Sequence, residues 1–482
     1  MVEELIPAPD PEAAWQALLG KPGVLWLDSA AEPATLGRYS FLTADPWAMI
    51  RSTGTVTMQS VGGCAFAPVA GDALTVARRA LAPWRHVTIP GLPPFQGGAA
   101  GYIGYDWGRV LERLPSPRYE DLDVPDVVLG LYDWTLAWDH AAKRAWLIST
   151  GAGVGPGSSE QRAADRLKQI QGWLAGGPAE ADPPVADAVP SPLASPESYP
   201  VLGSETAIRH GVRSTFSRPQ YLDAVARVRE YILAGDIFQA NLSQRFQATL
   251  NESAAHLYAR LRRVNPAAFA AYLDLGGVQI LSASPERFLR VEAATRMVET
   301  RPIKGTSPRG TGPMHDAALG QALIESEKDR AENLMIVDLL RNDLSRVCKP
   351  GTVRAPELFA LEHHPTVHHL VSTVVGELEE GNDAVDLLHA AFPGGSITGA
   401  PKVRAMEIIA ELEPTRRAVY CGSIGYLGFD GALDTSIVIR TYLIRRGTVF
   451  FQAGGGIVAD SEPAAEYQET LDKARGLMDA LG

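Results

Sequence analysis

Short apolar runs separated by glycine, proline and polar residues fill the first 150 residues, a pattern typical of strands and turns. Two of these runs, residues 24–29 and 145–150, end in polar turn residues and predict strands. Residues 11–19 begin with proline, which is favoured in the first turn of a helix, and they predict a helix. A further helix is predicted over residues 159–174, after a glycine-rich loop at 151–157.

A second region begins near Ser217 and changes the pattern. Residues 220–234 carry apolar side chains at helical spacing, and Gly235 then provides a C-terminal stop. The runs at 278–281 and 435–439 are rich in β-branched residues and predict strands. Because strand runs and helix runs do not alternate regularly, the pattern favours an α+β fold with layered antiparallel sheets over a doubly wound parallel sheet.

Residues 176–200 are rich in alanine, proline, serine and glycine and contain few large apolar side chains, which predicts a mobile connection. We therefore divide the chain into an N-terminal region at 1–175, a connection at 176–215 and a region at 216–482 that carries the chemistry. The 482 residues are 46% hydrophobic and 21% charged, which is typical of globular proteins.

Charge and cysteine content exclude several classes of function. The net charge is -12 and no dense block of Lys and Arg is present, so we expect no nucleic-acid partner. Cys64, Cys348 and Cys421 are too widely spaced for a disulfide framework or a zinc site and predict reduced thiols. The start lacks the basic and apolar segments of a signal peptide, and no apolar run approaches the roughly 18 residues of a membrane span. A cytoplasmic protein without membrane contact is expected.

Lys304 lies between Ile303 and Gly305 in the C-terminal region. A nucleophilic lysine must be neutral part of the time, and burial or nearby cations would lower its pKa towards that state. Taken alone, the local sequence favours a solvated lysine in a loop.

Two glutamates are candidates for a metal site. Glu332 shares the apolar stripe of a helix predicted over about 325–344, and a carboxylate turned towards a core needs a partner or a metal. The alternative is a glutamate at the rim, paired with an arginine. Glu469 lies near the start of the last predicted helix, where it could simply pair with Lys473. Two glutamates on different helices would suit Mg²⁺.

Two further features could bind an anion. Glycines 454–456 follow a predicted strand at 449–452, and a glycine turn there would expose backbone N–H groups, although a plain hairpin turn gives the same sequence. Arg440, predicted at a strand end, could hold a carboxylate through two hydrogen bonds, or it could form a surface ion pair.

Taken in order, these segments and those around Gly235–Gln239, Ser282–Phe288, His368–Ser372, Pro393–Lys402 and Glu466–Thr470 resemble the chorismate-utilising enzymes. That family includes anthranilate synthase component I, aminodeoxychorismate synthase component I, and the isochorismate and salicylate synthases. The resemblance is dense from Phe216 to Gly482 and looser at residues 25–29 and 37–41. It implies two interleaved α+β subdomains that form an α/β/β/α sandwich around a central active-site cleft.

The resemblance also implies roles for individual residues. Glu332 and Glu469 match two Mg²⁺ ligands, and the metal would hold the ring carboxylate of chorismate. Glu286 matches the general acid that protonates the departing 4-hydroxyl, and His369 matches a histidine of the cleft near the leaving group. Tyr420, Arg440 and the glycine run match the group that binds the enolpyruvyl carboxylate. The full set of expected substrate contacts is Tyr420, Arg440, Gly305, Thr306, Thr398, Gly454, Gly455, Gly456 and Lys473.

The residue at position 304 divides this family by product. Members that make anthranilate or isochorismate resemble Pro-Ile-Ala-Gly-Thr here, whereas aminodeoxychorismate synthases resemble the Pro-Ile-Lys-Gly-Thr of this chain. The resemblance implies that Lys304 attacks C2 of chorismate, ammonia adds at C4, and the product is 4-amino-4-deoxychorismate, a precursor of 4-aminobenzoate and folate. Anthranilate synthesis is the alternative, and a catalytically idle binding subunit is a further one.

Two partner molecules follow from the resemblance. No cysteine stands in a glycine-rich nucleophile turn with a later His-x-Glu, so ammonia is expected from a separate glutamine amidotransferase subunit. A tryptophan pocket is also implied, although a core filled by its own side chains is an equal alternative. Its walls would be Leu27, Asp28, Ser29, Pro266 and Phe269.

Overall fold

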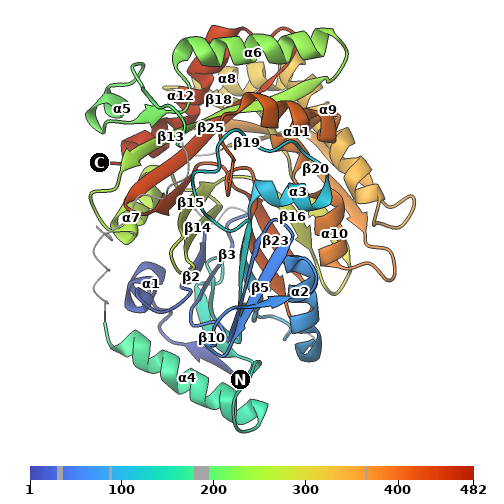
Figure 1. Cartoon of the computed structure of the whole chain (residues 1–482). Helices are drawn as coiled ribbons and strands as arrows, with labels where there is room; N and C mark the ends of the chain where they lie inside the picture. Colours follow the sequence, from blue (N-terminus) through green and yellow to red (C-terminus); the bar gives the residue numbers. More distant parts are fainter. Residues whose placement is uncertain (30–35, 86–88, 178–194, 364–366) are drawn as a thin grey trace.

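The structure is a computed structural model that describes residues 1–29, 36–85, 89–177, 195–363 and 367–482. Two large sheets run through the described residues (Figure 1). In spatial order, the first contains β1 (Val2–Leu5), β10 (Arg144–Ser149), β9 (Trp134–Asp139), β3 (Tyr39–Thr43), β2 (Leu25–Asp28), β14 (Phe269–Asp274), β15 (Gln279–Ser284), β24 (Thr441–Arg445), β25 (Thr448–Ile457), β13 (Gln239–Thr249), β12 (Arg213–Ser214) and β11 (Tyr199–Pro200), with β21 (Gly399–Ala400) beside β13.

The second sheet is built in the same way from both halves of the chain. Its order is β18 (Ile303–Pro308), β20 (Val367–Glu377), β17 (Met297–Thr300), β16 (Arg287–Val291), β23 (Leu433–Ile437), β22 (Ser423–Gly428), β7 (Gly98–Ile103), β8 (Val127–Tyr132), β4 (Ala48–Thr53), β5 (Val56–Val61) and β6 (Ala67–Val69), with β19 (Arg354–His363) beside β20. The strand pairs in both sheets are antiparallel, as the irregular strand and helix pattern predicted.

Helices cover the outer face of each sheet. The first sheet packs against α1 (Pro11–Leu18), α4 (Ser159–Ala175), α5 (Glu205–Arg209), α6 (Arg218–Leu233), α7 (Ala254–Val264), α11 (Lys402–Leu412) and α12 (Pro463–Ala480). The second packs against α2 (Ala73–Leu81), α3 (Gly108–Leu111), α9 (Glu327–Ser345) and α10 (Ala384–Ala391). Helix α8 (Pro313–Glu325) lies beside β18 and β19, and three 3₁₀ turns complete the set, namely η1 (Ala82–Trp84), η2 (Tyr105–Trp107) and η3 (Gly395–Ile397).

Alternation along single strands separates the layers. In β2, Leu25 points into the core between the sheets, whereas Trp26 points to the helix layer and lies 5.3 Å from Trp15 of α1, ring centre to ring centre. In β14, Leu273 and Tyr272 divide in the same way. The result is the α/β/β/α order that the resemblance implied.

Neither sheet is made by one end of the chain alone. Strand β2 pairs with β14, and β7 pairs with β22, so residues before 176 and after 215 share both sheets. The segment 195–215 adds β11, α5 and β12 to one edge, while residues 178–194 of the predicted connection lie outside the described residues. None of the described helices combines the length and apolar content needed to cross a membrane.

Several helix predictions hold because the helices are amphipathic and well capped. Helix α6 begins with a capping box, in which Ser217 and Gln220 bind each other's backbone N–H groups, and Gly235 follows it with φ +84°. Helices α1 and α4 lie within a residue of their predicted ranges, and Asp10 and Ser158 cap them.

Candidate active site

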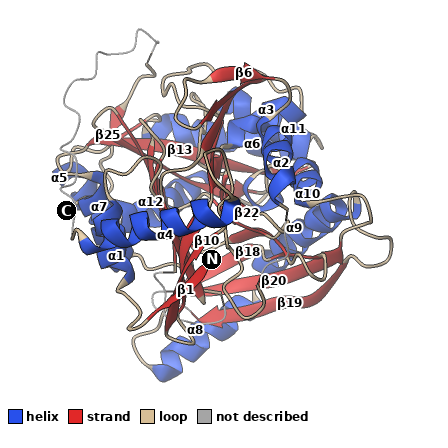
Figure 2. Ribbon diagram, turned by 90° about the horizontal axis from the view of Figure 1, so that it is seen from below, coloured by secondary structure: helices blue, strands red, loops and turns tan. Residues whose placement is uncertain are grey.

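Lys304 lies in strand β18 and is partly buried, so the interpretation as a solvated loop lysine is wrong. Strand β18 pairs with β20, but the register shifts between Ile303 and Thr306, which makes an irregularity around Lys304 and Gly305. Gly305 has φ +91°, and a side chain there would meet Asp329 of α9 at 3.1 Å. Glycine at 305 therefore allows the strand to run close to α9. Figure 2 shows β18, β20 and β19 lying together, seen from below.

The pKa of Lys304 is lowered by burial and, to a smaller extent, by the second cation Lys473. Glu332, Glu286 and Glu469 oppose this effect and stabilise the charged amine. All four groups therefore lie close enough to Lys304 to act on its charge. A lysine poised between these influences can supply a neutral amine, which is the state that a nucleophile requires.

Glu286 lies between β15 and β16 and is only 5% exposed. Burial raises its pKa to about 7, although hydrogen bonds from Ser396 and from the Ile303 backbone and the charge of Lys304 act in the opposite direction. The Ile303 contact brings this carboxyl to the residue that precedes Lys304. A carboxyl group with such a pKa can hold a proton near neutral pH and give it to a leaving group.

Glu332 on α9 and Glu469 on α12 interact electrostatically with each other and with Lys304. Burial raises the pKa of Glu332, whereas Lys473 lowers the pKa of Glu469 although burial opposes it. The predicted pair exists, with 2.5 Å between Lys473 Nζ and Glu469 Oε1. No arginine of the described residues pairs with Glu332, but Lys328 Nζ lies 4.0 Å from its Oε1.

This pair of carboxylates fits a magnesium ion by its chemistry. Among the described residues, no group of three or more His, Cys, Asp or Glu side chains could hold a metal. Mg²⁺ is commonly bound by one or two carboxylates and keeps several waters or substrate oxygens, so two glutamates from two helices are sufficient. Gly455 leaves room for this cluster, since a side chain there would meet Glu466 at 3.0 Å and Glu469 at 3.4 Å.

His369 on β20 is buried, and its Nδ1 lies 2.9 Å from the hydroxyl of Thr306 on β18. The two residues are direct neighbours in the register of the strands, so this contact joins Thr306, a predicted substrate contact, to the predicted cleft histidine. Strand β20 is tied to α9 by Ser372, whose hydroxyl donates to Asn333 Oδ1 at 2.5 Å. Asn333 is fully buried beside Glu332, so this bond fixes the helix that carries the glutamate.

Arg440 and Tyr420 form the other end of the predicted set. Arg440 has φ +52° in the turn between β23 and β24, and burial lowers its pKa while Tyr420 acts against that shift. No described carboxylate lies within ion-pair distance of Arg440, so the surface ion-pair interpretation is wrong for the described residues. A buried guanidinium without a carboxylate is suited to bind one from a ligand.

The prediction of a glycine turn at 454–456 is wrong. All three glycines lie inside β25. They pair with β13, where Gly454, Gly455 and Gly456 lie opposite Ser243, Leu242 and Asn241. Lys473 Nζ donates to the carbonyl oxygen of Gly454 at 3.1 Å.

Thr398 is fully buried, its hydroxyl donates to the Gly394 carbonyl at 3.0 Å, and its own carbonyl accepts from the Asn241 backbone.

Sequence reasoning assigned no role to Gln239 or Ser396. Gln239, on β13, is fully buried and packs on Gly456, where a side chain would come within 2.3 Å of its amide nitrogen. No described residue hydrogen-bonds either amide atom of Gln239, an unusual state for a buried polar group. Both residues lie in the glycine-containing segments that carried the resemblance, which was the available signal.

The residues of the predicted tryptophan pocket are occupied by contacts within the protein. Asp28 is buried and pairs with Arg262 of α7 at 2.6 Å. The hydroxyl of Ser29 donates to the Tyr39 carbonyl at 2.7 Å, and Phe269 lies under the guanidinium of Arg287, 5.1 Å from ring centre to Cζ. Leu27 and Pro266 are partly buried. Tryptophan binding remains a prediction.

We expect Arg262→Met to lower the free energy of unfolding by about 3–5 kcal/mol at pH 8, because it leaves the buried Asp28 carboxylate without its arginine partner. Burial already raises the pKa of Asp28 above its ordinary value. A raised carboxyl pKa costs stability as pH rises above the unfolded value, so the loss should shrink near pH 4. Denaturant unfolding at both pH values measures it, with the exposed neighbour Arg263→Met as control. Equal losses at both pH values would contradict the assignment.

Comparison with known proteins decides the family. The model for chorismate binding enzymes matches residues 24–479. The chain belongs to this family. Aminodeoxychorismate synthase component 1 of Klebsiella aerogenes is 42% identical over 98% of this chain and 97% of its own length. The corresponding protein of Escherichia coli K12 is 46% identical over 80% of this chain and 78% of its own length.

Anthranilate synthases are also similar to this member of the family. Component 1 from Streptomyces coelicolor is 43% identical over 86% of this chain and 78% of its own length. Among solved structures, anthranilate synthase component I from Streptococcus pneumoniae matches with a TM-score of 0.76 and 31% identity, over 93% of each chain. The menaquinone-specific isochorismate synthase of Escherichia coli shares the fold, with a TM-score of 0.70 at 19% identity.

Proposed function

We propose that this protein converts chorismate and ammonia to 4-amino-4-deoxychorismate, in the route to 4-aminobenzoate and folate. The observation that carries the proposal is the partly buried Lys304. Its pKa is lowered, and it lies close to Glu286, whose raised pKa lets it carry a proton. The relatives named aminodeoxychorismate synthase component 1, which match most of this chain, support the same product.

The proposed reaction is covalent. The neutral amine of Lys304 forms a C–N bond to C2 of chorismate, the ring double bond shifts, and the C4–O bond breaks. Glu286 gives its proton to the departing hydroxyl, so water leaves. Ammonia then forms a bond to C4, the double bond shifts back, and the bond between C2 and Lys304 breaks. The ammonium group formed at C4 returns a proton to the Glu286 carboxylate. The sum is chorismate plus ammonia giving the amino product plus water, and the lysine returns to its starting state.

The two carboxylates of the substrate are assigned to opposite ends of the site. Arg440 and Tyr420 would bind the enolpyruvyl carboxylate, helped by the backbone of β25 at Gly456. Glu332 and Glu469 would hold Mg²⁺, which when bound neutralises and orients the ring carboxylate. Thr306 and Thr398 would contact the same ring carboxylate, and His369 would stay near the leaving group through its bond to Thr306.

Glu332→Gln is expected to raise the Mg²⁺ concentration needed for half-maximal turnover. It replaces one of two charged ligands by an amide, which binds Mg²⁺ more weakly. Calorimetric titration with Mg²⁺ should give weaker binding in the same variant. Asp338→Asn, on an exposed turn of the same helix, is the matched control. Unchanged Mg²⁺ binding in Glu332→Gln would contradict the proposed ligand.

The ammonia donor is proposed to be a glutamine amidotransferase subunit. The relatives are named component 1, which speaks for a second component, and this chain contains no recognisable glutaminase motif. We further propose a cytoplasmic location, in line with the reduced thiols predicted from the sequence. Tryptophan is retained as a ligand to be tested by calorimetry.

Product analysis tests the function directly. The protein is incubated with chorismate, Mg²⁺ and an ammonium salt, and the products are separated by chromatography and identified by mass. We expect 4-amino-4-deoxychorismate as the main product. Anthranilate as the main product would favour the second candidate, for which the 43% identity to an anthranilate synthase speaks. No turnover, with or without a glutaminase partner, would favour a binding subunit.

A further inference from the structure

A cavity of 460 Å³ lies where the two sheets meet, and none of the candidate active-site residues lines it. Arg51 of β4 and Val128 of β8 reach it from the second sheet. The β14–β15 turn, at residues 275–278, and Arg445 at the end of β24 reach it from the first. Its size is within the range of about 300–1,000 Å³ that is common for small-molecule sites.

One wall of the cavity is apolar. Its five aliphatic side chains are all less than a tenth exposed and come from the loop before β8, from β8 itself and from the β14–β15 turn. They are Leu122, Val124, Val128, Leu275 and Val278. This wall would suit the hydrocarbon body of a ligand, because such a body loses its contact with water there.

Two arginines that hydrogen-bond to the β14–β15 turn supply positive charge. Arg51 Nη2 donates to the Leu275 carbonyl at 2.9 Å, and Arg445 Nη1 donates to the Gly277 carbonyl at 2.6 Å. The Nε atoms of both are buried, and no described residue accepts a hydrogen bond from them. The backbone bonds hold both guanidinium groups at the cavity while leaving donors unused.

The charge balance in the cavity is incomplete. Burial and the nearby Arg445 lower the pKa of Arg51, so the two cations oppose each other, and no described carboxylate forms an ion pair with Arg51. Among the described residues, the one ion pair of Arg445 is with the exposed Asp123 at 3.4 Å, and Asp123 also pairs with Arg446 at 3.2 Å. An anion between Arg51 and Arg445 would relieve this repulsion.

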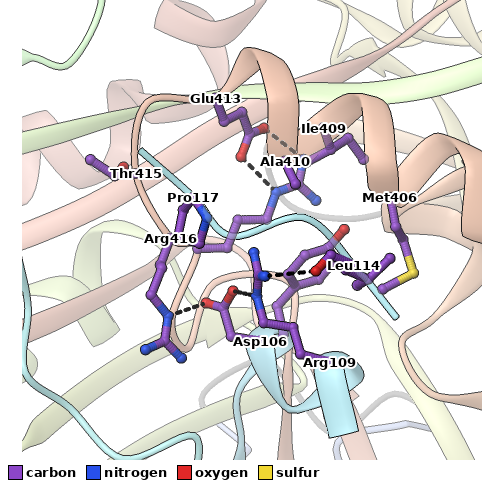
Figure 3. A pocket seen from close by; sticks show the side chains of 12 residues that line it. Asp106, Arg109, Leu114, Pro117, Met406, Ile409, Ala410, Glu413, Thr415 and Arg416 are labelled. Atoms are coloured by element: carbon purple, nitrogen blue, oxygen red, sulfur yellow. Dashed lines mark hydrogen bonds and ion pairs between the residues drawn. The ribbon is translucent and has the colours of Figure 1, made fainter. Parts of the chain in front are cut away.

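A third arginine at the cavity is already neutralised. Arg416 forms ion pairs with Asp126 and with Asp106, and Figure 3 shows the Asp106 contact from the small neighbouring pocket, where Asp106 also binds Arg109. Arg416 therefore requires no further anion. Glu120 also lines the cavity and acts on Arg416, whereas no described ion pair joins it to Arg51 or Arg445.

We propose that this cavity binds a small organic carboxylate, with its carboxylate between Arg51 and Arg445 and its apolar body against the Leu122–Val128 wall. Guanidinium groups bind carboxylates through paired, charge-assisted hydrogen bonds. The site is separate from the candidate active site and does not depend on the proposed reaction.

Calorimetric titration of the full-length protein with benzoate tests this site. We expect benzoate to bind, and the uncharged isostere benzamide to bind at least about tenfold more weakly, since it cannot form the charged hydrogen bonds. Arg51→Gln and Arg445→Gln should each weaken benzoate binding at least about tenfold. Arg51→Lys retains the charge but loses the planar group, so it should also weaken binding, which provides a second variant if Arg51→Gln does not fold.

Two control variants separate this cavity from other binding. Arg446 also pairs with Asp123 but does not line the cavity. The benzoate affinity of Arg446→Gln should therefore be unchanged. Arg440→Gln should also leave it unchanged, whereas benzoate held at the candidate active site would be lost in that variant. The proposal is overturned if benzamide binds as tightly as benzoate, if benzoate affinity survives both Arg51→Gln and Arg445→Gln, or if it is lost in Arg440→Gln. Chorismate turnover without benzoate should be unchanged in Arg51→Gln, so a failure here is distinct from a failure of the proposed reaction.

Discussion

Lys304→Ala is expected to reduce formation of 4-amino-4-deoxychorismate by at least about a thousandfold, because it removes the nucleophile that would open the route to C4. The pocket that remains still contains Glu286, Glu332 and Arg440, so chorismate should still bind. Ammonia or water could then reach C2 directly and give ortho-substituted products. Chromatography with mass detection measures both products, and the intact mass of the wild-type protein with chorismate alone should reveal the lysine adduct.

Two variants show whether the amine itself matters. Lys304→Arg keeps a cation among the glutamates but offers no comparable nucleophile, so it should be as inactive as the alanine variant. Lys328→Ala removes an exposed lysine that lies 4.0 Å from Glu332 and should keep most of the activity. Unchanged amination at C4 in Lys304→Ala would refute the covalent role.

Glu286→Gln should lower turnover by about 10²–10⁴-fold, the usual contribution of a general acid. Burial raises the pKa of Glu286 to about 7, so the wild-type carboxyl is protonated below that pH and ionised above it. The wild-type kcat/KM should therefore fall as pH rises through about 7. In Glu286→Gln this limb should disappear, because the amide does not titrate.

The kinetic measurement must hold the concentration of free ammonia constant, since the ammonium ion itself titrates with pH.

A stability measurement provides an independent check. The folded pKa lies above the unfolded one, so the ionised carboxylate costs stability as pH rises from about 4.5 to 7. Glu286→Gln should thus be more stable than the wild type at pH 8 by on the order of 3 kcal/mol. Glu299→Gln, in the ion pair with Arg287, is the control. Retention of the pH limb in Glu286→Gln would exclude this residue as the acid.

Local sequence was sufficient where an element carries its own signals. Helix α6 has its capping box, its apolar stripe and a terminal glycine within one short segment. The order of strands lacked such signals, because β2 pairs with β14 and β7 pairs with β22, which are far along the chain. Only tertiary contacts select these partners. The α/β/β/α order was therefore predicted from the resemblance, and the strand pairings became known only from the structure.

The candidate site was predictable as a set but not residue by residue. Lys304 lies two residues after Pro302 and directly before Gly305, which locally indicates a loop, yet pairing of β18 with β20 makes it part of a strand. The glycines at 454–456 were predicted as a turn for the same reason, and β13 holds them in an extended strand. Gln239 could not be singled out, because its unpaired amide is a property of its burial.

The mixed strand order also bears on how the chain matures during synthesis. When the ribosome has made residues 1–175, β2 lacks its neighbour β14 and β7 lacks its neighbour β22, so both incomplete sheets expose open edges. Such edges favour pairing between nascent chains. The contacts that close them span long stretches of sequence, which slows folding. Release of the C-terminal strands, rather than completion of an N-terminal unit, would then be the step after which the protein resists aggregation and proteolysis.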